Sequence, residues 1–297
     1  DWIGDLKART IDLSTGIVSA VPLWSAQALL DAKVYSTRNI YMPDLTDVTA
    51  TGNKLKHFCW PGTSGTTCSD GSGLDAAEQA YFNPNQLPQS VSWNYAQKAV
   101  AAVDVVTSDT GRILVNWLRG ETAYEDTGAV ASTDLFRNRV SILGDIINAQ
   151  PAYVKTSPFN YSDTGYPEFK ACTEGTGTGC PSTQFPTPGQ PRRGTVFAAA
   201  NDGMLHAFET DVNNDPYFQT SGIGTPITSD DTYQGNNAGN GEERWAFIPS
   251  IVLPNLYKLA STPYSHRYST DGSPAVGDVC ISNPCNGLSD WRTILVA

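Results

Sequence analysis

The stretch that decides the fold reads Val196-Phe-Ala-Ala-Ala-Asn-Asp-Gly-Met-Leu-His-Ala-Phe208, and after a polar loop it continues as Arg244-Trp-Ala-Phe-Ile248. The β-branched and aromatic residues at 195–197 indicate a strand. Asn201-Asp-Gly203 predicts a tight turn, because Asn and Gly tolerate the positive φ that a two-residue hairpin needs. Residues 204–208 then return as the partner strand, and 244–248 form a third strand that carries a tryptophan.

This order of strand, Asn-Asp-Gly turn, strand, loop and Trp strand is typical of one blade of a quinoprotein-like β-propeller. Two weak internal repeats support the interpretation. The segment at 4–8 resembles 202–207, and Gly144-Asp-Ile-Ile-Asn-Ala-Gln-Pro-Ala-Tyr-Val154 parallels Thr270-Asp-Gly-Ser-Pro-Ala-Val-Gly-Asp-Val279. Because proline cannot donate to a central ladder, each Pro is expected at the start of a blade's first strand. We therefore expect a mainly β fold, a partial quinoprotein-like β-propeller with long loop insertions.

The whole of 1–297 is expected to be the N-terminal portion of a propeller domain, with about two blades and the start of a third. Insertions are expected at 43–135, 156–193 and 211–243. Apolar spacing within 93–119 predicts two short helices, the second capped by Asp109 or Thr110 and ended by Gly120. Since propellers close with about 4–8 blades, we expect Ala297 to be a boundary and further blades to follow it.

The six cysteines fall into three close pairs, which are Cys59 with Cys68, Cys172 with Cys180, and Cys280 with Cys285. Sequence proximity favours disulfides within each pair, although other connectivities exist. Disulfides imply an oxidising compartment. The formal net charge of −11 argues against nucleic acid as a partner, and no apolar run is long enough to predict a membrane span.

Several ordered blocks closely resemble the C-terminal propeller of the PilC/PilY family of type IV pilus proteins. Besides the segments quoted above, they include Trp2-Ile-Gly-Asp-Leu-Lys-Ala8 and Trp291-Arg-Thr-Ile-Leu-Val-Ala297. The resemblance implies pilus biogenesis and pilus-tip adhesion by a non-enzymatic propeller scaffold that presents surface-binding loops. It implies an extracellular, pilus-associated location on the bacterial cell surface. The implied partners are minor pilins, the pilus tip, a host or abiotic surface and the rest of the chain's own propeller.

Two alternatives remain open from the sequence. The blade pattern is shared with quinoprotein-like oxidoreductases, but those enzymes need a complete ring and, in many cases, adjacent cysteines, which this chain lacks. The other alternative is a structural subunit of an extracellular filament, in which exposed blade edges join neighbouring copies.

Asp211, Asn213 and Asp215 resemble the start of a calcium loop with oxygen ligands at alternate positions. Pro216 stands where such a loop needs glycine, so we expect an ordinary Asn/Asp-rich loop and no metal site. The resemblance implies calcium in the family's propeller, but in a loop outside this chain. No cofactor is expected in this segment.

No catalytic residue is predicted, because neither His206 nor His266 has a serine or cysteine nucleophile motif beside it. Both are expected to be hydrogen-bonded structural histidines. Asp145, Asp202, Asp271 and Asp278 are expected to cap turns, and Trp24, Trp245 and Trp291 to pack between blades as buried aromatics. The family resemblance implies a structural motif that comprises Asn201, Asp202, Gly203, His206, Trp245, His266, Asp271 and Trp291.

Overall fold

The computed structural model describes residues 2–46, 54–62, 68, 72–106, 111–128, 132–182, 184–185, 189, 191–210 and 241–297. The strands are β1 (Lys7–Ala8), β2 (Trp24–Ser25), β3 (Ile40–Pro43), β4 (Leu55–His57), β5 (Ala152–Val154), β6 (Thr195–Ala200), β7 (Met204–Glu209), β8 (Glu243–Phe247), β9 (Ala275–Cys280) and β10 (Trp291–Val296). The α-helices are α1 (Ala26–Ala32), α2 (Ala76–Gln79), α3 (Tyr95–Val106), α4 (Arg112–Arg119) and α5 (Tyr166–Thr173). The 3-10 helices are η1 (Tyr35–Thr37), η2 (Ala80–Phe82), η3 (Pro84–Gln86), η4 (Pro88–Ser92), η5 (Leu253–Ala260) and η6 (Leu288–Asp290).

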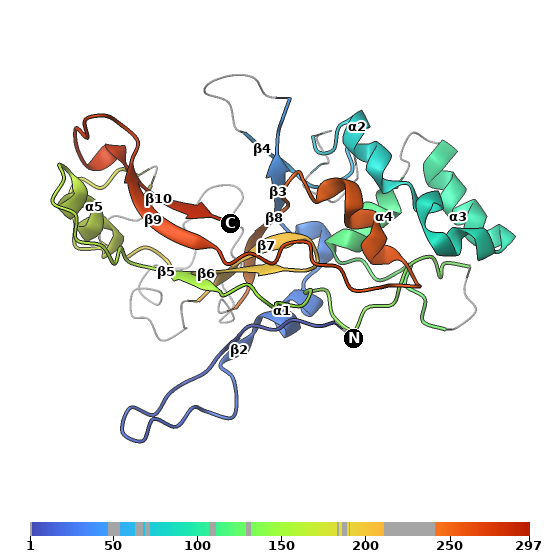
Figure 1. The fold of residues 1–297 in the computed structure, drawn as a ribbon, viewed down its shortest axis with the longest axis horizontal. Coiled ribbons are helices and arrows are strands. Elements are labelled where there is room, and N and C mark those ends of the chain that lie inside the picture. Colours follow the sequence, from blue (N-terminus) through green and yellow to red (C-terminus); the bar gives the residue numbers. More distant parts are fainter. Residues whose placement is uncertain are drawn as a thin grey trace.

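A six-stranded sheet with the order β4-β3-β8-β7-β6-β5 lies at the centre of the molecule (Figure 1). Strands β5 to β8 are consecutive and antiparallel, whereas β3 joins the edge of β8 in parallel, with Ile40 opposite Ala246. Separate two-stranded pairs are formed by β1 with β2 and by β9 with β10. The described part of the chain is therefore built mainly on β-sheet with short helices, and its strands do not close into a barrel.

The hairpin β6–β7 is confirmed as the sequence predicted it. Gly203 has φ of +89° at the turn, and Ala200 pairs with Met204 on either side. Nearly every residue of both strands is buried, which explains why the run reads as continuously apolar rather than alternating. The predicted third strand is confirmed as β8, one residue earlier than expected.

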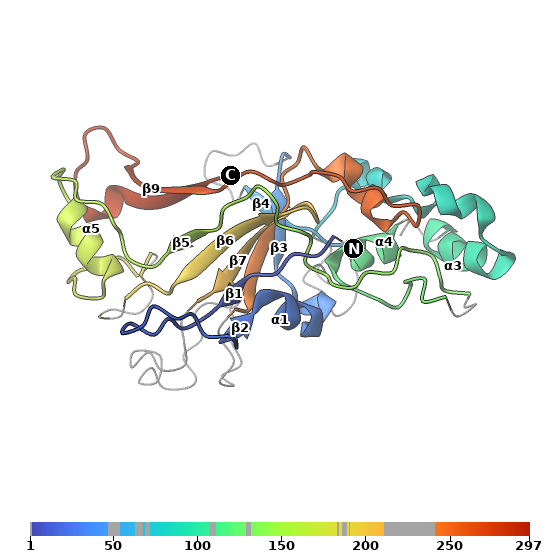
Figure 2. The ribbon, with the colours of Figure 1, turned by 60° about the horizontal axis from the view of Figure 1, so that its bottom comes forward.

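A helical lobe packs at one end of the sheet, where α3, α4 and η5 lie together (Figure 2). Helices α3 and α4 confirm the two predicted within 93–119, and Gly120 ends α4 with φ of +119°. The predicted caps Asp109 and Thr110 lie outside the described residues, and Gly111 occupies the N-cap of α4. The apolar side chains of this lobe, together with some from the central sheet, form the largest buried cluster of the described structure.

The region 43–135 is more than a loop insertion with two helices. Strand β4 extends the central sheet through β3, and Phe58, Phe82 and Leu135 are fully buried in the helical lobe. The sequence of 43–92 does not indicate these ordered elements. Strand β4 has only three residues, and the 3-10 helices η3 and η4 begin at prolines, which are also typical of loops.

A second lobe lies at the opposite end, where α5 packs against the β9–β10 hairpin (Figure 1). Tyr166, Phe169 and Trp291 form its buried aromatic centre. Helix α5 falls within 156–193, where the glycine, proline and serine content had indicated only an insertion. Gly165 stands at its N-cap with φ of +80°, and a Cβ there would meet the backbone of Gly287.

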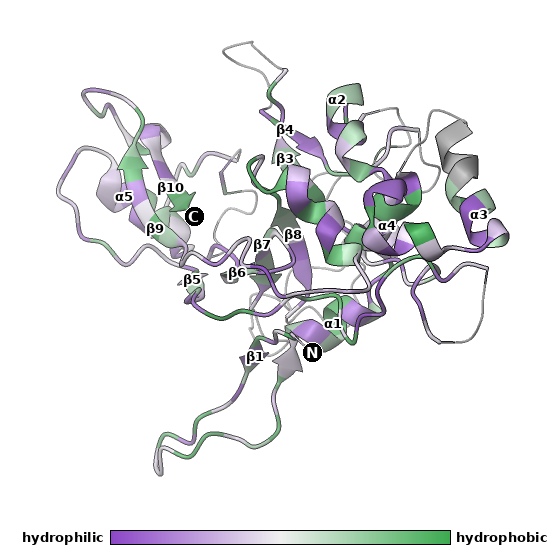
Figure 3. Ribbon diagram, turned by 45° about the vertical axis from the view of Figure 1, so that its right-hand side comes forward, coloured by the Kyte–Doolittle hydropathy of each residue, from purple (hydrophilic) through white to green (hydrophobic). Residues whose placement is uncertain are grey.

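Residues 1–25 were expected to be β structure, and they form only the short pair β1–β2 and one further bridge, between Ile11 and Val18. This arm projects from the body in Figure 3. Helix α1 follows it directly, with Ser25 as the N-cap that accepts from the Ala28 N–H. No described helix has the length and apolar character needed to cross a membrane.

Candidate functional site

The candidate site is a group of buried polar side chains around the turn between β6 and β7. Its centre is Glu243, the first residue of β8, whose side chain is fully buried. Arg38 donates to both Glu243 carboxylate oxygens, from Nε to Oε2 and from Nη2 to Oε1, each at 2.8 Å. Arg38 Nη1 donates to the Arg119 carbonyl at 2.7 Å. The ion pair therefore joins the segment before β3 to β8 and to the end of α4.

His206 lies between two carboxylates in the middle of β7. Its Nδ1 is 2.8 Å from Glu243 Oε1, and its Nε2 is 3.0 Å from Asp202 Oδ2. Burial opposes the charged imidazolium, but Asp202 and Glu243 outweigh it and raise the pKa of His206 to about 9. The imidazolium donates from both ring nitrogens at neutral pH, so neither nitrogen is free to act as a base.

The pKa of Glu243 is lowered, whereas that of His206 is raised. Burial favours the neutral acid, but the charges of Arg38 and His206 hold the pKa well below its usual value. The carboxylate is therefore ionised at neutral pH although no water reaches it. A buried charge of this kind is tolerated only because its partners are present.

A second group surrounds Asn201 at the same turn. Asn201 Nδ2 donates to Asp145 Oδ2 at 2.9 Å, and His266 Nε2 lies 2.9 Å from the same oxygen. Asn201 Oδ1 accepts from the Ser269 N–H at 3.0 Å. One amide side chain thus joins the segment before β5 to the segment before β9.

Glycines allow three segments that are far apart in the sequence to come into direct backbone contact. The Gly144 N–H donates to Asp202 Oδ2 at 3.1 Å, and a Cβ on Gly144 would lie 2.3 Å from the Asp202 nitrogen. A Cβ on Gly4 would lie 2.1 Å from the Gly144 oxygen. The N-terminal segment, the 144–145 turn and the 201–203 turn therefore form three layers in direct contact.

Asp271 links the two segments of the second internal repeat. Its Oδ1 accepts from the Asn148 N–H at 3.0 Å, and its Oδ2 accepts from Asn148 Nδ2. Two residues further on, the Gln150 N–H donates to Ser273 Oγ at 2.8 Å. The turn before β5 and the turn before β9 thus lie side by side in matched positions.

Asp278 was expected to cap a turn, and that expectation is wrong. It lies inside β9 and is buried, where Thr293 Oγ1 donates to Oδ1 at 2.6 Å and Tyr166 Oη donates to Oδ2 at 2.9 Å. Burial, together with the neighbouring Asp278 charge, raises the pKa of Tyr166 to about 12. The carboxylate stabilises the lobe of α5, β9 and β10.

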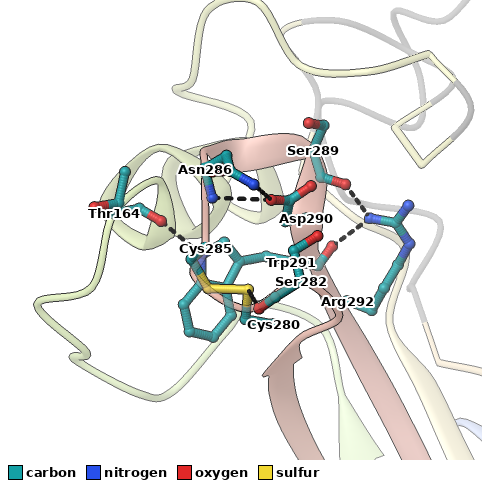
Figure 4. The surroundings of a disulfide bond; sticks show 9 residues. All are labelled: Thr164, Cys280, Ser282, Cys285, Asn286, Ser289, Asp290, Trp291 and Arg292. Atoms are coloured by element: carbon teal, nitrogen blue, oxygen red, sulfur yellow. Dashed lines mark hydrogen bonds between the residues drawn. A yellow bond between two sulfur atoms is a disulfide. The ribbon is translucent and has the colours of Figure 1, made fainter.

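The predicted tryptophans divide into two classes. Trp291 is buried and its Nε1 donates to the Thr164 carbonyl at 3.0 Å (Figure 4). Trp24 and Trp245 are only half-buried, so the expectation that all three would be buried is wrong. Beyond the irregularity that separates the buried Glu243 from the rest of β8, Ala246 and the following Ile248 are buried, which places Trp245 on the other face, where its ring lies 5.7 Å from that of Phe197.

The six cysteines pair as proximity favoured. The structure contains the disulfides Cys59–Cys68, Cys172–Cys180 and Cys280–Cys285. Figure 4 shows the third of these at the tip of the β9–β10 hairpin, beside Trp291. The second and third disulfides both belong to the lobe of α5, β9 and β10. The calcium candidates Asp211, Asn213 and Asp215 lie outside the described residues.

Sequence reasoning missed Arg38, Glu243 and Arg119. Glu243 stands in the run Glu242-Glu-Arg244, which is typical of an exposed strand end, and its partner Arg38 is 205 residues away. Only a spatial arrangement reveals that this glutamate is buried. Within the described residues, the charges of Arg38, Glu243, His206 and Asp202 are paired with one another.

Comparison with known proteins matches the chain over its whole length. The Type IV pilus biogenesis factor PilY1 of Pseudomonas aeruginosa strain PAK is 28% identical over 299 residues, which cover 100% of this chain and 19% of the relative. A Type IV pilus biogenesis factor PilY1 homolog of Xylella fastidiosa strain Temecula1 is 27% identical over 306 residues, or 100% of this chain and 17% of the relative. This chain is a homologue of the PilY1 family. It spans about a fifth of the length of these PilY1 relatives.

No family model matches the chain, and no solved structure matches it. The PilY1 homology therefore rests on sequence similarity to the named biogenesis factors. The names of these relatives describe them as type IV pilus biogenesis factors.

Proposed function

We propose that this chain is a section of a non-enzymatic β-propeller scaffold, which acts in type IV pilus biogenesis and in adhesion at the pilus tip. The observation that carries the proposal is the relation between the β5–β8 unit and the β9–β10 hairpin. Four consecutive antiparallel strands are followed by a hairpin whose preceding turn is hydrogen-bonded to the turn before β5.

This arrangement fits two adjacent blades. A propeller blade is a four-stranded antiparallel sheet, and successive blades repeat it around an axis. Strands β5 to β8 supply one such sheet, and β9 with β10 supply the first two strands of the next. The bonds from Asn148 to Asp271 and from Gln150 to Ser273 join equivalent turns, as blade repetition requires.

The pilus role is supported by the PilY1 relatives, whose names describe pilus biogenesis. An extracellular, pilus-associated location is supported by the three disulfides, which persist in oxidising compartments. The proposed partners are minor pilins, the pilus tip, a host or abiotic surface and further blades of the same protein. The insertions are proposed to carry the binding surfaces, since loops on a rigid scaffold are the usual place for recognition.

A scaffold role is supported by the chemistry of the polar cluster. His206 has both ring nitrogens on carboxylates, and Glu243 is shared between His206 and Arg38. Because these contacts occupy both ring nitrogens of His206 and both carboxylate oxygens of Glu243, neither side chain is available as a general acid or base. The cluster is proposed to fix the geometry of β7, β8 and the segment before β3.

The test is complementation of a bacterium that lacks the gene for this protein. Wild-type protein and His266→Gln, which keeps a donor for Asp145, are expected to restore sheared surface pilin to the same level. The Glu243→Gln variant is not expected to restore surface pilin, because the substitution destabilises the scaffold. Normal abundance of the His266→Gln protein without pili would contradict a non-enzymatic role, and so would a quinone absorption band in the purified wild-type protein.

A further inference from the structure

A cleft lies beside the polar cluster, between the N-terminal segment and α4. Trp2 and Trp117 line it from these two elements, and Arg137, Asp202 and Tyr264 line it from three others. The N end and α4 lie close together in Figure 2. The cleft therefore draws on five segments that are far apart in the sequence, so its shape depends on the complete fold of the described part.

Arg137 lines this cleft with a guanidinium group whose donors are only partly used. Its guanidinium carbon lies 4.2 Å from the centre of the Tyr264 ring and 6.0 Å from that of Trp117. Its Nε donates to the Leu259 carbonyl at 3.0 Å. Within the described residues, Nη1 and Nη2 have no acceptor, and no carboxylate lies within ion-pair distance. Burial lowers the pKa of Arg137, so its charge is partly removed from water without a counter-charge in contact.

Two other buried arginines near the cleft are each paired with a carboxylate. Arg38 pairs with Glu243 at 2.8 Å, and Arg139 pairs with Glu125 at 2.6 Å. Arg139 also donates to two carbonyls, so its guanidinium is fully engaged. Arg137 differs in that the described structure leaves one side of its planar fork open to the cleft. A half-buried cation of this kind gains free energy when an anion reaches it.

The two carboxylates in the cleft do not meet that need, since both are engaged elsewhere. Asp145 accepts from Asn201 and His266, and Asp202 accepts from His206 and from the Gly144 N–H. The indole Nε1 of Trp117 also lacks a partner among the described residues, but this atom is buried and does not count as a donor for a ligand. The cleft thus offers the unpartnered Nη1 and Nη2 of Arg137 and no unused carboxylate.

We propose that this cleft binds a peptide through a carboxylate, held by the fork of Arg137. A planar carboxylate fits the guanidinium in two parallel hydrogen bonds. A doubly charged phosphate is disfavoured, because the fork is single and two carboxylates line the same cleft. Trp2, Ile3 and Leu118 supply apolar walls for a side chain beside the carboxylate. The proposal stands independently of the pilus function.

The experiment uses the full chain and two peptides, acetyl-Leu-Glu-Leu-amide and the same peptide with Gln in place of Glu. Binding is followed by the NMR signals of the tryptophan indole N–H groups. The Glu peptide is expected to shift the Trp117 signal and to bind at least about tenfold more tightly than the Gln peptide, the difference expected for one charge-assisted pair. Equal binding of both peptides would overturn the proposal, as would tighter binding of inorganic phosphate.

Two variants complete the test. Arg137→Met keeps an apolar stem and is expected to abolish the preference for the Glu peptide. Its unfolding midpoint is expected to change only slightly, because removal of an unpaired charge offsets the loss of the hydrogen bond to the Leu259 carbonyl and of the contact with the Tyr264 ring. Arg244→Met is the matched control, since Arg244 bonds Thr195 on the sheet and does not line the cleft. Its peptide binding is expected to equal that of the wild type. A preserved preference in Arg137→Met, or a large fall in its midpoint, would show that Arg137 serves the fold alone.

Discussion

Glu243→Gln is expected to destabilise the protein more than any other single isosteric change in the sheet. The substitution keeps the shape of the side chain but removes the charge that Arg38 and His206 share. Both partners are fully buried beside it. Arg38 and the imidazolium would then face each other's charge without a carboxylate between them.

The magnitude follows from the loss of one member of a buried charge network. Breaking such a pair costs about 3–5 kcal/mol, because the remaining charge stays buried and unpaired. The rise in the pKa of His206 from 6.5 to about 9 is caused by Asp202 and by Glu243 together, so Glu243→Gln removes only a part of the preference for the charged imidazole in the folded state.

The assay is urea unfolding with the disulfides intact, at several pH values. A histidine whose pKa is raised on folding stabilises the protein fully below its unfolded pKa, and this stabilisation is lost as pH rises through the folded value. Wild-type stability from His206 is therefore present below pH 6.5 and is lost toward pH 9. The difference between Glu243→Gln and the wild type is expected to be largest near pH 6 and to narrow toward pH 9.

Glu242→Gln is the control, because this neighbour is only half-buried and lies outside the cluster. It is expected to change the unfolding free energy by less than about 0.5 kcal/mol. The reasoning is refuted if Glu243→Gln costs less than about 1 kcal/mol at pH 6, or if its effect does not depend on pH between 6 and 9.

Three further perturbations test other parts of the fold. Gly203→Ala is expected to cost roughly 1–2 kcal/mol in urea unfolding, because φ there is +89°, and an unchanged midpoint would contradict the turn geometry. Trp291→Ala is expected to lower the free energy of unfolding by about 3–5 kcal/mol, and Trp245→Ala by clearly less, because Trp245 is only half-buried. The opposite order would show that Trp245 faces the core. Replacing both cysteines of the Cys172–Cys180 disulfide with serine is expected to lower stability by about 2–3 kcal/mol, and thermal unfolding that matches the wild type would show that the disulfide is dispensable.

Local signals in the sequence were sufficient for the elements that depend on local physics. The Asn-Asp-Gly turn predicted the β6–β7 hairpin, because few residues other than glycine adopt the backbone conformation at Gly203. Gly120 likewise marked the end of α4. These features need no information from distant residues.

Contacts between segments that are far apart in the sequence could not be predicted from local sequence patterns. The pairing of Arg38 with Glu243 spans 205 residues, and Glu243 has the ordinary appearance of a charged strand end. The burial of Trp245 was misjudged because a strand has two faces, and only the packing of Ala246 decides which one faces the core. The cleft around Arg137 is assembled from five segments and has no motif of its own.

The proposal that this PilY1 homologue is a scaffold at the pilus tip is tested most directly by immunogold labelling of sheared surface filaments. The antibody would be raised against residues 143–297, which contain the β5–β8 sheet and the β9–β10 hairpin. The account predicts label at one end of each filament. Label along the shaft would identify a filament subunit joined through its strand edges, and filaments without label would contradict the pilus-tip assignment.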